Sequence, residues 1–307
     1  MKIAVVSTSR ADMGALTPVA AEISLHQKME FIKWNRKDSI SATIAVICGD
    51  RFETVELAFK LNLSHIPIAH LSGGDITEGS QDDCFRHAIT KLSHLHFPTN
   101  EESYKRILQM GEEPWRVHNF GSPSIDGIKS CTLFDRATAL KFLDLEDGPF
   151  VLVSLHPNTF GKTDFELSEL YSYLMLLPED TKRILIGPNA DAEADKITYQ
   201  FIVWSETMPN TKYIKTVPRV HFLSLMKHCV EMVGNSSAML YEAPTLGTKT
   251  VMIGDRQQGR QPVYGDGRSA KRIAKVICSV KDPQALLRKK FVDLNYGRPT
   301  SRYAANR

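Results

Sequence analysis

The chain has 307 residues, about twice the length of a typical domain, so two domains are expected. Its content of 42% hydrophobic and 24% charged residues is ordinary for a globular protein. A net charge of +3 with dispersed positive residues argues against nucleic-acid binding, and no apolar run is long enough to span a bilayer.

The first half of the chain alternates short apolar runs with longer helical patterns. This alternation predicts strands at Lys2–Ser7, Thr43–Cys48, Pro67–Leu71 and His94–Pro98, and helices at about Met13–Ser24, Glu53–Leu61 and Asp82–Ser93. Strands that alternate with helices imply βαβ units, and therefore a parallel sheet.

The same pattern restarts after Gly148 and Pro149. Strands are predicted at Phe150–Leu155, Lys182–Ile186, Tyr213–Ile214, Glu231–Gly234 and Thr250–Ile253, with helices at about Asp164–Leu176, Asp195–Trp204, His221–Lys227 and Ala238–Thr245. We therefore predict an α/β protein with two successive doubly wound domains, residues 1–147 and 148–260, divided near Asp147.

Polar residues follow the predicted strands in both halves. Ligands of parallel α/β sheets bind beyond the carboxyl ends of the strands, so functional side chains should lie there. In the first domain these positions hold Arg10, Asp50, Arg51, Gly73, Gly74 and Asp75, and in the second His156, Asn189, Asp191, Asn235, Ser236 and Ser237. We expect both groups to face one interdomain cleft.

The segment from Gly234 to Ser237 precedes a helix and is suited to bind an anion. Unpaired backbone N–H groups and two hydroxyls at a helix N-terminus favour negative charge, and a diphosphate would fit. An ordinary N-cap explains the same serines about equally well. Glu242, about one turn further, could accept both hydroxyls of a ribose, or be an exposed helix charge.

Two further residues could contact phosphate. Arg256 lies in a glycine-flanked loop after a strand, and its planar, permanently charged guanidinium suits phosphate, although a solvated loop would explain it too. His156 directly follows a strand and could donate to a phosphate oxygen or assist a leaving group. A structural role for this histidine is an equal alternative.

Carboxylates gather in the first domain, at Asp50, Asp75, Glu78, Asp82 and Asp83. Asp50 ends a buried apolar strand, where a carboxylate is costly unless it is partnered or used. Asp82 and Asp83 begin a predicted helix, so one of them could simply cap it. Paired carboxylates with separated pKa values can supply an acid and a base to one site.

Neither a metal site nor a cofactor motif is predicted. His94 and His96 alternate on one strand, but no third ligand is nearby, so a structural role is favoured. The five cysteines are scattered without close metal-ligand spacing, which is typical of reduced thiols in a cytoplasmic protein. We expect no metal and no cofactor.

Together these motifs resemble the hydrolysing UDP-N-acetylglucosamine 2-epimerases, and most of all the bacterial enzymes that feed sialic and related nonulosonic acid synthesis. The likeness runs in order from residue 1 to about 277. It rests on Thr8–Asp12, Gly49–Glu53, Ile66–Gly79, Asp82–Phe97, Gly121–Asp126, Leu155–Thr159, Gly187–Ala192, Gly234–Arg260 and Tyr264–Gly267.

The resemblance implies a GT-B fold, with two Rossmann-like domains and UDP in the cleft between them. It implies that a helix within 261–280 packs back on the first domain, while 281–307 stays unassigned. By matching positions, Arg10, His156, Ser236, Ser237 and Arg256 contact the diphosphate, Glu242 the ribose, and Asn189 and Asp191 the sugar or the cleft. Asp50 and Asp82 match acidic residues needed for catalysis, and His156 is a further catalytic candidate.

Two departures from the family bear on these expectations. The family often has a catalytic glutamate directly before the Gly-Gly pair, where this chain has Ser72; Asp75 or Glu78 could substitute, or the substrate could differ. The stretch from about Glu30 to Thr43 is also some tens of residues shorter than in the family. A parallel crossover needs a dozen or more residues, so the first unit barely has room for its inner strand.

The resemblance implies conversion of UDP-N-acetylglucosamine to N-acetylmannosamine and UDP, by elimination to a 2-acetamidoglucal and rehydration. The alternatives are the same reaction on UDP-N,N'-diacetylbacillosamine, a GT-B glycosyltransferase, and a non-catalytic nucleotide-sugar sensor. The expected partners are the UDP-sugar and further copies of the chain, as a dimer or tetramer. Neither nucleic acid nor a membrane is expected as a partner.

Overall fold

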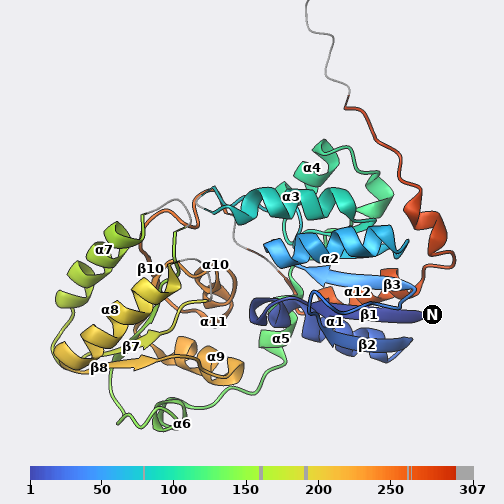
Figure 1. The fold of residues 1–307 in the computed structure, drawn as a ribbon. Helices are drawn as coiled ribbons and strands as arrows, with labels where there is room; N and C mark the ends of the chain where they lie inside the picture. Colours follow the sequence, from blue (N-terminus) through green and yellow to red (C-terminus); the bar gives the residue numbers. More distant parts are fainter. Residues whose placement is uncertain (79, 159–161, 190–192, 261–262, 264, 295–307) are drawn as a thin grey trace, which may run out of the picture.

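A computed structural model of the chain describes residues 1–78, 80–158, 162–189, 193–260, 263 and 265–294. It has two α/β lobes, each built on its own five-stranded sheet (Figure 1). The strands of the first sheet come from residues 2–97 and those of the second from residues 150–252. Within the described residues, no helix is both long and apolar enough to cross a membrane.

The first sheet is parallel throughout and has the strand order β2-β1-β3-β4-β5. Its strands are β1 (Lys2–Ser7), β2 (Lys28–Lys33), β3 (Ile44–Cys48), β4 (Ile68–Leu71) and β5 (Leu95–Phe97). β3 and β4 are buried along their whole length, which is why their sequences are nearly continuous apolar runs.

Helices cover both faces of this sheet. One face carries α1 (Met13–Ser24) and α12 (Ser269–Cys278), which pack on each other, and the other carries α2 (Phe52–Leu63) and α3 (Asp82–Leu92). The remaining elements of this half are the 3-10 helices η1 (Arg10–Asp12) and η2 (Pro114–Arg116), with α4 (Glu101–Gln109) and α5 (Pro123–Lys129).

The sequence pattern did not predict β2, because this edge strand is only partly buried. All of its residues pair in parallel with β1, and its lysines and glutamate face outward. Residues 34–43 then lead to β3 without a helix, and Trp34 and Ile40 pack against the core on the α2 side. The short stretch therefore accommodates β2 at the edge of the sheet, with a loop in place of a helical crossover to β3.

The second sheet is also parallel and has the order β10-β9-β6-β7-β8. Its strands are β6 (Phe150–Ser154), β7 (Lys182–Ile186), β8 (Thr211–Ile214), β9 (Glu231–Gly234) and β10 (Thr250–Met252). Its helices are α6 (Arg136–Lys141), α7 (Thr163–Met175), α8 (Ala194–Thr207), α9 (Arg219–His228), α10 (Ala238–Tyr241) and α11 (Ala243–Leu246). One core lies under α7 and α8, and a second lies under α6, α9, α10 and α11.

The helix predicted at Ala238–Thr245 is broken in the structure. α10 ends at Tyr241 and α11 begins at Ala243, so that Glu242 lies at the junction. Pro244 is in the first turn of α11, where it lacks the N–H that a continuous helix would need. The break places Glu242 at the end of one short helix and the start of the next.

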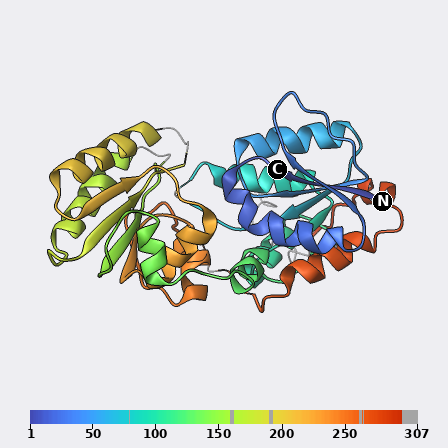
Figure 2. The ribbon, with the colours of Figure 1, turned by 90° about the horizontal axis from the view of Figure 1, so that it is seen from below.

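The chain returns to the first domain after the second sheet. Ile273 and Ile277 of α12 are buried in the core of the first domain, and Leu286 of η3 (Gln284–Leu287) joins them. The buried Arg116 donates to the carbonyl oxygens of Leu286 (2.9 Å) and Arg288 (3.0 Å). Figure 2 shows this red C-terminal segment against the first lobe, with the second lobe beside it.

Candidate active site

Residues at the carboxyl ends of the two sheets meet between the domains. The hydroxyl of Tyr241, in the second domain, donates to Oδ2 of Asp75 in the first at 3.1 Å. Arg260, also from the second domain, lies 3.7 Å from Asp50. Asp50 and Asp75 follow β3 and β4, so the polar strand ends of the first domain contact the second domain directly.

A buried arginine, Arg86 of α3, organises the acidic half of the site. It pairs with the carboxylate of Asp50 and donates to the carbonyl of Asp75 (2.9 Å) and the hydroxyl of Thr77 (2.9 Å). It also lies 3.2 Å from Asp83. Burial lowers the pKa of Arg86, but the charges of Asp50 and Asp75 outweigh it, so the guanidinium is charged. A buried cation is tolerated only with such partners.

Asp50 is held in its ionised form by two arginines. Burial raises its pKa, but the charges of Arg86 and Arg260 outweigh burial and bring the pKa to about 2. A carboxylate stabilised so strongly is a weak base and carries no proton near neutral pH. Asp50 is therefore better suited to fixing two arginines in the site than to moving protons.

Asp75 is 2% exposed and is held by neutral donors. Ser103 and Asn100 (3.3 Å), at the start of α4, donate to Oδ1, and Tyr241 donates to Oδ2. The preceding Gly74 has a φ of +82°, and a Cβ there would lie 2.5 Å from the Ser103 carbonyl oxygen. Glycine is needed for the turn that brings Asp75 against α4.

The two acidic residues at the start of α3 have different surroundings. Asp83 accepts the Thr77 N–H at 2.5 Å and pairs with Arg86, so it fixes the turn that leads into the helix. Asp82 is half-buried beside it, and its N–H donates to the hydroxyl of Ser80 at 3.3 Å. Of the two residues, Asp83 is thus the one that stabilises the start of α3.

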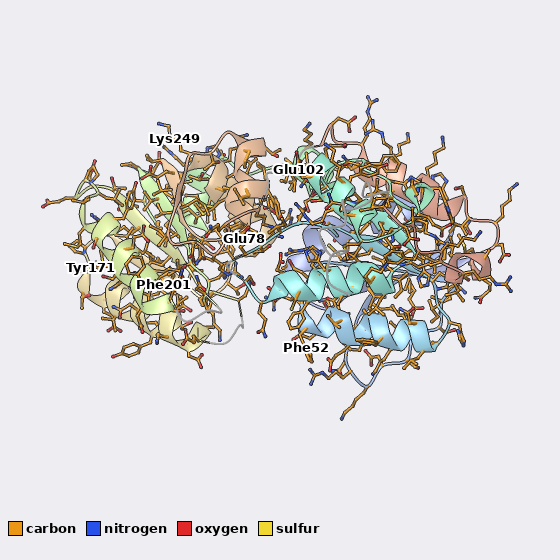
Figure 3. All side chains as sticks on the ribbon, turned by 90° about the horizontal axis from the view of Figure 1, so that it is seen from above. Phe52, Glu78, Glu102, Tyr171, Phe201 and Lys249 are labelled. Atoms are coloured by element: carbon orange, nitrogen blue, oxygen red, sulfur yellow. The ribbon has the colours of Figure 1, made fainter. Side chains whose placement is uncertain are left out.

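Glu78 lies at the junction of the two domains (Figure 3). Its side chain is exposed, and its backbone N–H donates to the carbonyl of Gln258 at 3.1 Å. A Cβ on Gly259 would lie 3.1 Å from the Glu78 carboxyl group. Glu78 therefore marks where the loop after β10 reaches the first domain.

In the second domain, three loops meet around the fully buried Asn235. Its side chain accepts the N–H of His156 (2.7 Å) and donates to the His156 carbonyl (2.9 Å). The side-chain amide of Gln257 donates to the backbone carbonyl of Asn235 (2.8 Å). The preceding Gly234 has a φ of +138°, and a Cβ there would lie 2.1 Å from the carbonyl oxygen of Ser154. These contacts join the loops that follow β6, β9 and β10.

A fully buried carboxyl, Glu166 of α7, contacts all three loops. It accepts from the amides of Asn158 (3.2 Å) and Asn235 (3.3 Å), and a Cβ on Gly254 would lie 2.1 Å from its Oε1. Burial raises the pKa of Glu166 to about 7, against the opposing effect of the two amide hydrogen bonds. Glu166 is thus the group that ties the loops together.

His156 is buried and oriented from two sides. Besides its backbone contacts with Asn235, its Nδ1 accepts the N–H of Asn189 at 3.1 Å. With Nδ1 as an acceptor, the proton of the neutral ring is on Nε2, which can then donate. This tautomer suits a donor to phosphate. Asn189 itself is half-buried directly after β7.

The other predicted phosphate ligands lie on the same loops. Ser236 is buried, and its hydroxyl accepts the N–H of Ala238 at 3.3 Å, whereas Ser237, the N-cap residue of α10, makes no side-chain cap hydrogen bond. Ser237 is half-buried beside it. Arg256 is buried, and its Nε donates to the carbonyl of Pro157 at 3.2 Å. The N-cap explanation of these serines is therefore wrong for Ser237, and Ser236 contacts the first residue of α10 instead.

Glu242 is buried and ion-paired rather than an exposed helix charge. Arg219, at the start of α9, lies 3.3 Å from its Oε1. Burial raises the pKa of Glu242, and the charge of Arg219 opposes this. The guanidinium also lies against Gly14 of α1, where a Cβ would be 3.0 Å from it. The expected ribose ligand thus lies close to the first domain.

Three further residues, Arg10, Arg51 and Asp191, were predicted to bind the substrate. The side chain of Arg10 and the whole of Asp191 lie outside the described residues. Arg51 is half-buried, and its positive charge is one of the influences that lower the pKa of Asp50.

His94, which directly precedes β5, and His96 within it both have structural partners. Nδ1 of His94 accepts the N–H of Ile68 at 3.1 Å, and Nε2 of His96 lies 3.0 Å from the buried Glu112. In the part of the chain that the structure describes, no group of three or more His, Cys, Asp or Glu residues could hold a metal ion.

Several residues of the site were not singled out from the sequence, namely Arg86, Glu166, Arg219 and Tyr241. Arg86 did carry a signal, because it lies on the same helix face as the buried Ile89 and Thr90, where a cation needs acidic partners. Glu166 likewise stands among buried leucines of α7.

Comparison with known proteins identifies relatives of this chain. The family described as UDP-N-acetylglucosamine 2-epimerase matches residues 37–263. The chain is 35% identical over 227 residues to a GDP/UDP-N,N'-diacetylbacillosamine 2-epimerase (hydrolyzing) from Campylobacter jejuni, covering 73% of this chain and 59% of that protein. It is 33% identical over 228 residues to a UDP-N-acetylglucosamine 2-epimerase from Neisseria meningitidis, covering 73% and 58%. The chain thus spans about three-fifths of the length of these relatives.

Solved structures show the same fold. The UDP-GlcNAc 2-epimerase of Methanocaldococcus jannaschii, in complex with UDP-GlcNAc and UDP, has a TM-score of 0.71 at 13% identity, covering 90% of this chain and 99% of that one. The Neisseria meningitidis enzyme bound to UDP-GlcNAc has a TM-score of 0.65 at 14% identity, covering 95% of each chain. The two Rossmann-like domains therefore form a GT-B fold, as predicted, and the chain belongs to the UDP-N-acetylglucosamine 2-epimerase family.

Proposed function

We propose that this protein is a hydrolysing 2-epimerase, which converts UDP-N-acetylglucosamine to N-acetylmannosamine and UDP. The observation that carries the proposal is the meeting of buried carboxylates from the first domain with the anion-type loops of the second, through Tyr241–Asp75 and Arg260–Asp50. The family match and the relatives named as hydrolyzing epimerases support it.

In this proposal the second domain holds the nucleotide. The diphosphate is bound by Ser236, Ser237, His156 and Arg256, with Arg10 from the first domain, because N–H groups, hydroxyls and arginine favour an anion. Glu242 accepts from the ribose hydroxyls while its other oxygen keeps Arg219. The resemblance assigns Asn189 and Asp191 to the sugar.

The reaction begins with loss of UDP. The C1–O bond breaks with its electron pair going to UDP, and the donors around the diphosphate stabilise that charge. The sugar gains oxocarbenium character, which acidifies C2–H. A carboxylate then removes this proton and leaves a 2-acetamidoglucal. Water adds its oxygen to C1, and a proton returns to the opposite face of C2, which inverts that carbon.

Two proton-transferring groups on opposite faces of C2 are needed. The sequence assigned them to Asp50 and Asp82, and we retain Asp82. The ion pairs of Asp50, with its pKa of about 2, favour a different role for it, in which it fixes Arg86 and Arg260. We assign the second proton transfer to Asp75, because the hydrogen bonds of its carboxyl group come from neutral side chains and not from an arginine.

No cofactor has a part in this scheme. The leaving group, the proton transfers and the added water account for every bond that breaks or forms. We also propose a cytoplasmic location, on the argument from the cysteines given above.

A second candidate substrate is UDP-N,N'-diacetylbacillosamine. The Campylobacter jejuni relative, at 35% identity, is named for this sugar. The chemistry at C1 and C2 is the same, and only the substituents at C4 and C6 of the ring differ. Every residue role above therefore applies to both candidate substrates. They would be distinguished only by the residues that contact C4 and C6 of the sugar.

The test is product analysis with each UDP-sugar alone. We expect UDP-N-acetylglucosamine to yield UDP and free N-acetylmannosamine, identified by NMR. Faster turnover of UDP-N,N'-diacetylbacillosamine would reassign the substrate. A glycosyltransferase would release no 2-epimer without an acceptor, and a sensor would bind UDP without turnover, so either outcome would reject the proposal.

A further inference from the structure

Tyr241 is the side chain through which the second domain reaches the carboxylates of the first. Its hydroxyl is 3.1 Å from Oδ2 of Asp75, although the two residues are 166 positions apart in the sequence. Its ring lies under the guanidinium of Arg260, whose charge centre is 4.8 Å from the ring centroid. Arg260 of the second domain therefore holds the ring in position, and Asp75 of the first domain holds the hydroxyl.

The two oxygens of Asp75 are held by different domains. Oδ1 accepts from Asn100 and Ser103, both in the first domain. Among the described residues, Oδ2 has Tyr241 as its one hydrogen-bonding partner. The first domain alone therefore fixes only Oδ1 of Asp75. The carboxylate is held at both oxygens only when the second domain contacts the first.

The phenol can act here only as a donor. Burial raises the pKa of Tyr241 well above its usual range, the charge of Arg260 opposes this, and Asp75 adds to it. The hydroxyl therefore keeps its proton near neutral pH. A neutral donor orients a carboxylate without neutralising it, unlike the arginine that pairs with Asp50.

The next residue in the chain connects this contact to the nucleotide. Tyr241 ends α10, and Glu242, the proposed ribose ligand, begins the junction with α11. Glu242 is paired with Arg219, which lies against Gly14 of the first domain. Recognition of the nucleotide and orientation of Asp75 thus depend on two adjacent residues of one short segment.

We infer that Tyr241 is a positioning residue for the reaction, which orients Asp75 from the opposite domain when the cleft is closed over the nucleotide. This inference rests on the proposed function, because it takes Asp75 as a group that works on the protons of C2. It adds a residue that couples nucleotide binding in the second domain to the carboxylates of the first.

Tyr241→Phe tests the inference, because phenylalanine keeps the ring under Arg260 and removes only the hydroxyl. Tyr173→Phe is the matched control, since the hydroxyl of Tyr173 also bonds a carboxylate, that of Glu231, away from the cleft. The full-length variants are compared with the wild type in kcat and KM for UDP-N-acetylglucosamine, in UDP affinity by calorimetry, and in small-angle scattering with saturating UDP.

We expect Tyr241→Phe to lower kcat by about 10- to 100-fold, the usual scale for one hydrogen bond to a charged group, with UDP affinity within about threefold. Its radius of gyration with UDP should exceed that of Tyr173→Phe, which should match the wild type throughout. A purely structural role would instead lower UDP affinity and kcat together.

An unchanged kcat in Tyr241→Phe overturns the inference, whatever the scattering shows. If the wild type turns over neither UDP-sugar, the proposed function has failed separately. The scattering then decides the inference alone, and equal radii for the two variants overturn it.

Discussion

The two halves of the site hold their buried polar groups in opposite ways. In the first domain a buried arginine, Arg86, pairs with Asp50 and keeps that carboxylate ionised, with a pKa of about 2. In the second, the partners of Glu166 are the neutral amides of Asn158 and Asn235, and burial raises its pKa to about 7 against their opposing effect. The difference separates two tasks, because an ion-paired carboxylate holds the arginines of the first domain in place, whereas neutral amides would leave the loop N–H groups for an incoming anion.

The largest expected effect comes from removing the cation of the first domain. Arg86→Met leaves the half-buried Asp50 with only the more distant Arg260, and we expect the free energy of unfolding in urea to fall by about 3–5 kcal/mol. Arg272→Met is the control, since Arg272 pairs with Asp266 at the surface, where solvent screens the pair and it contributes little to stability. Similar losses in the two variants would show that Arg86 is not the organising charge.

The second domain should respond to pH through Glu166. Its folded-state pKa of about 7 exceeds the ordinary 4.5, so the folded protein retains a proton that the unfolded chain releases between these values. The contribution of this group to stability is therefore present below about pH 4.5 and lost as the pH rises to about 7, by roughly 3 kcal/mol.

Glu166→Gln cannot ionise, so its unfolding free energy should lack this fall relative to the wild type. Glu169→Gln is the matched control on the same helix, because Glu169 accepts the Gly254 N–H at the surface. The measurement is urea unfolding at several pH values. A difference between Glu166→Gln and the wild type that stays constant from pH 4.5 to 7 would contradict the assignment.

Within the first domain, neighbouring acidic residues should separate into chemical and structural roles. Asp82→Asn should lower kcat by roughly 100-fold or more, the usual scale for a lost acid or base, with little change in UDP affinity. Asp50→Asn should lose stability together with activity, because it leaves the charge of Arg86 buried. The exposed Asp147→Asn is the control, and a kcat for Asp82→Asn above a tenth of the wild-type value would reject its role.

The smallest effect is expected at the anion loops. Arg256→Ala removes one charged hydrogen-bond donor and should weaken UDP binding by about 10- to 100-fold, or about 1.5–3 kcal/mol. Arg36→Ala, which removes an exposed arginine of the first domain, should leave UDP affinity unchanged. Calorimetric titration with UDP measures both, and equal affinities would place the diphosphate elsewhere.

The sequence predicted most of the sheet framework but not all of it. β3 and β6 were predicted because continuous apolar runs are typical of parallel strands buried on both faces. β2 was missed because an edge strand with exposed lysines lacks that pattern. The helix expected at Ala238–Thr245 is two helices, because Pro244 lacks the N–H that a continuous helix would need.

The candidate site divides in the same way. Residues that follow strands could be identified from the sequence, because the carboxyl ends of parallel strands lie at one edge of a sheet. Arg86, Glu166 and Tyr241 could not, because their partners Asp50, Asn235 and Asp75 are 36, 69 and 166 residues away. Only the folded chain shows which distant charges and amides meet.

The most direct test of the account is the fate of the C2 hydrogen. Wild-type protein is given UDP-N-acetylglucosamine in heavy water, and the released sugar is analysed by NMR and mass spectrometry, with oxygen-18 water in a parallel reaction. The account predicts N-acetylmannosamine with deuterium at C2, because the glycal has no hydrogen there, and with the labelled oxygen at C1 and none at phosphorus. A released sugar with its original hydrogen at C2 would contradict elimination, and with it the roles given to Asp75 and Asp82.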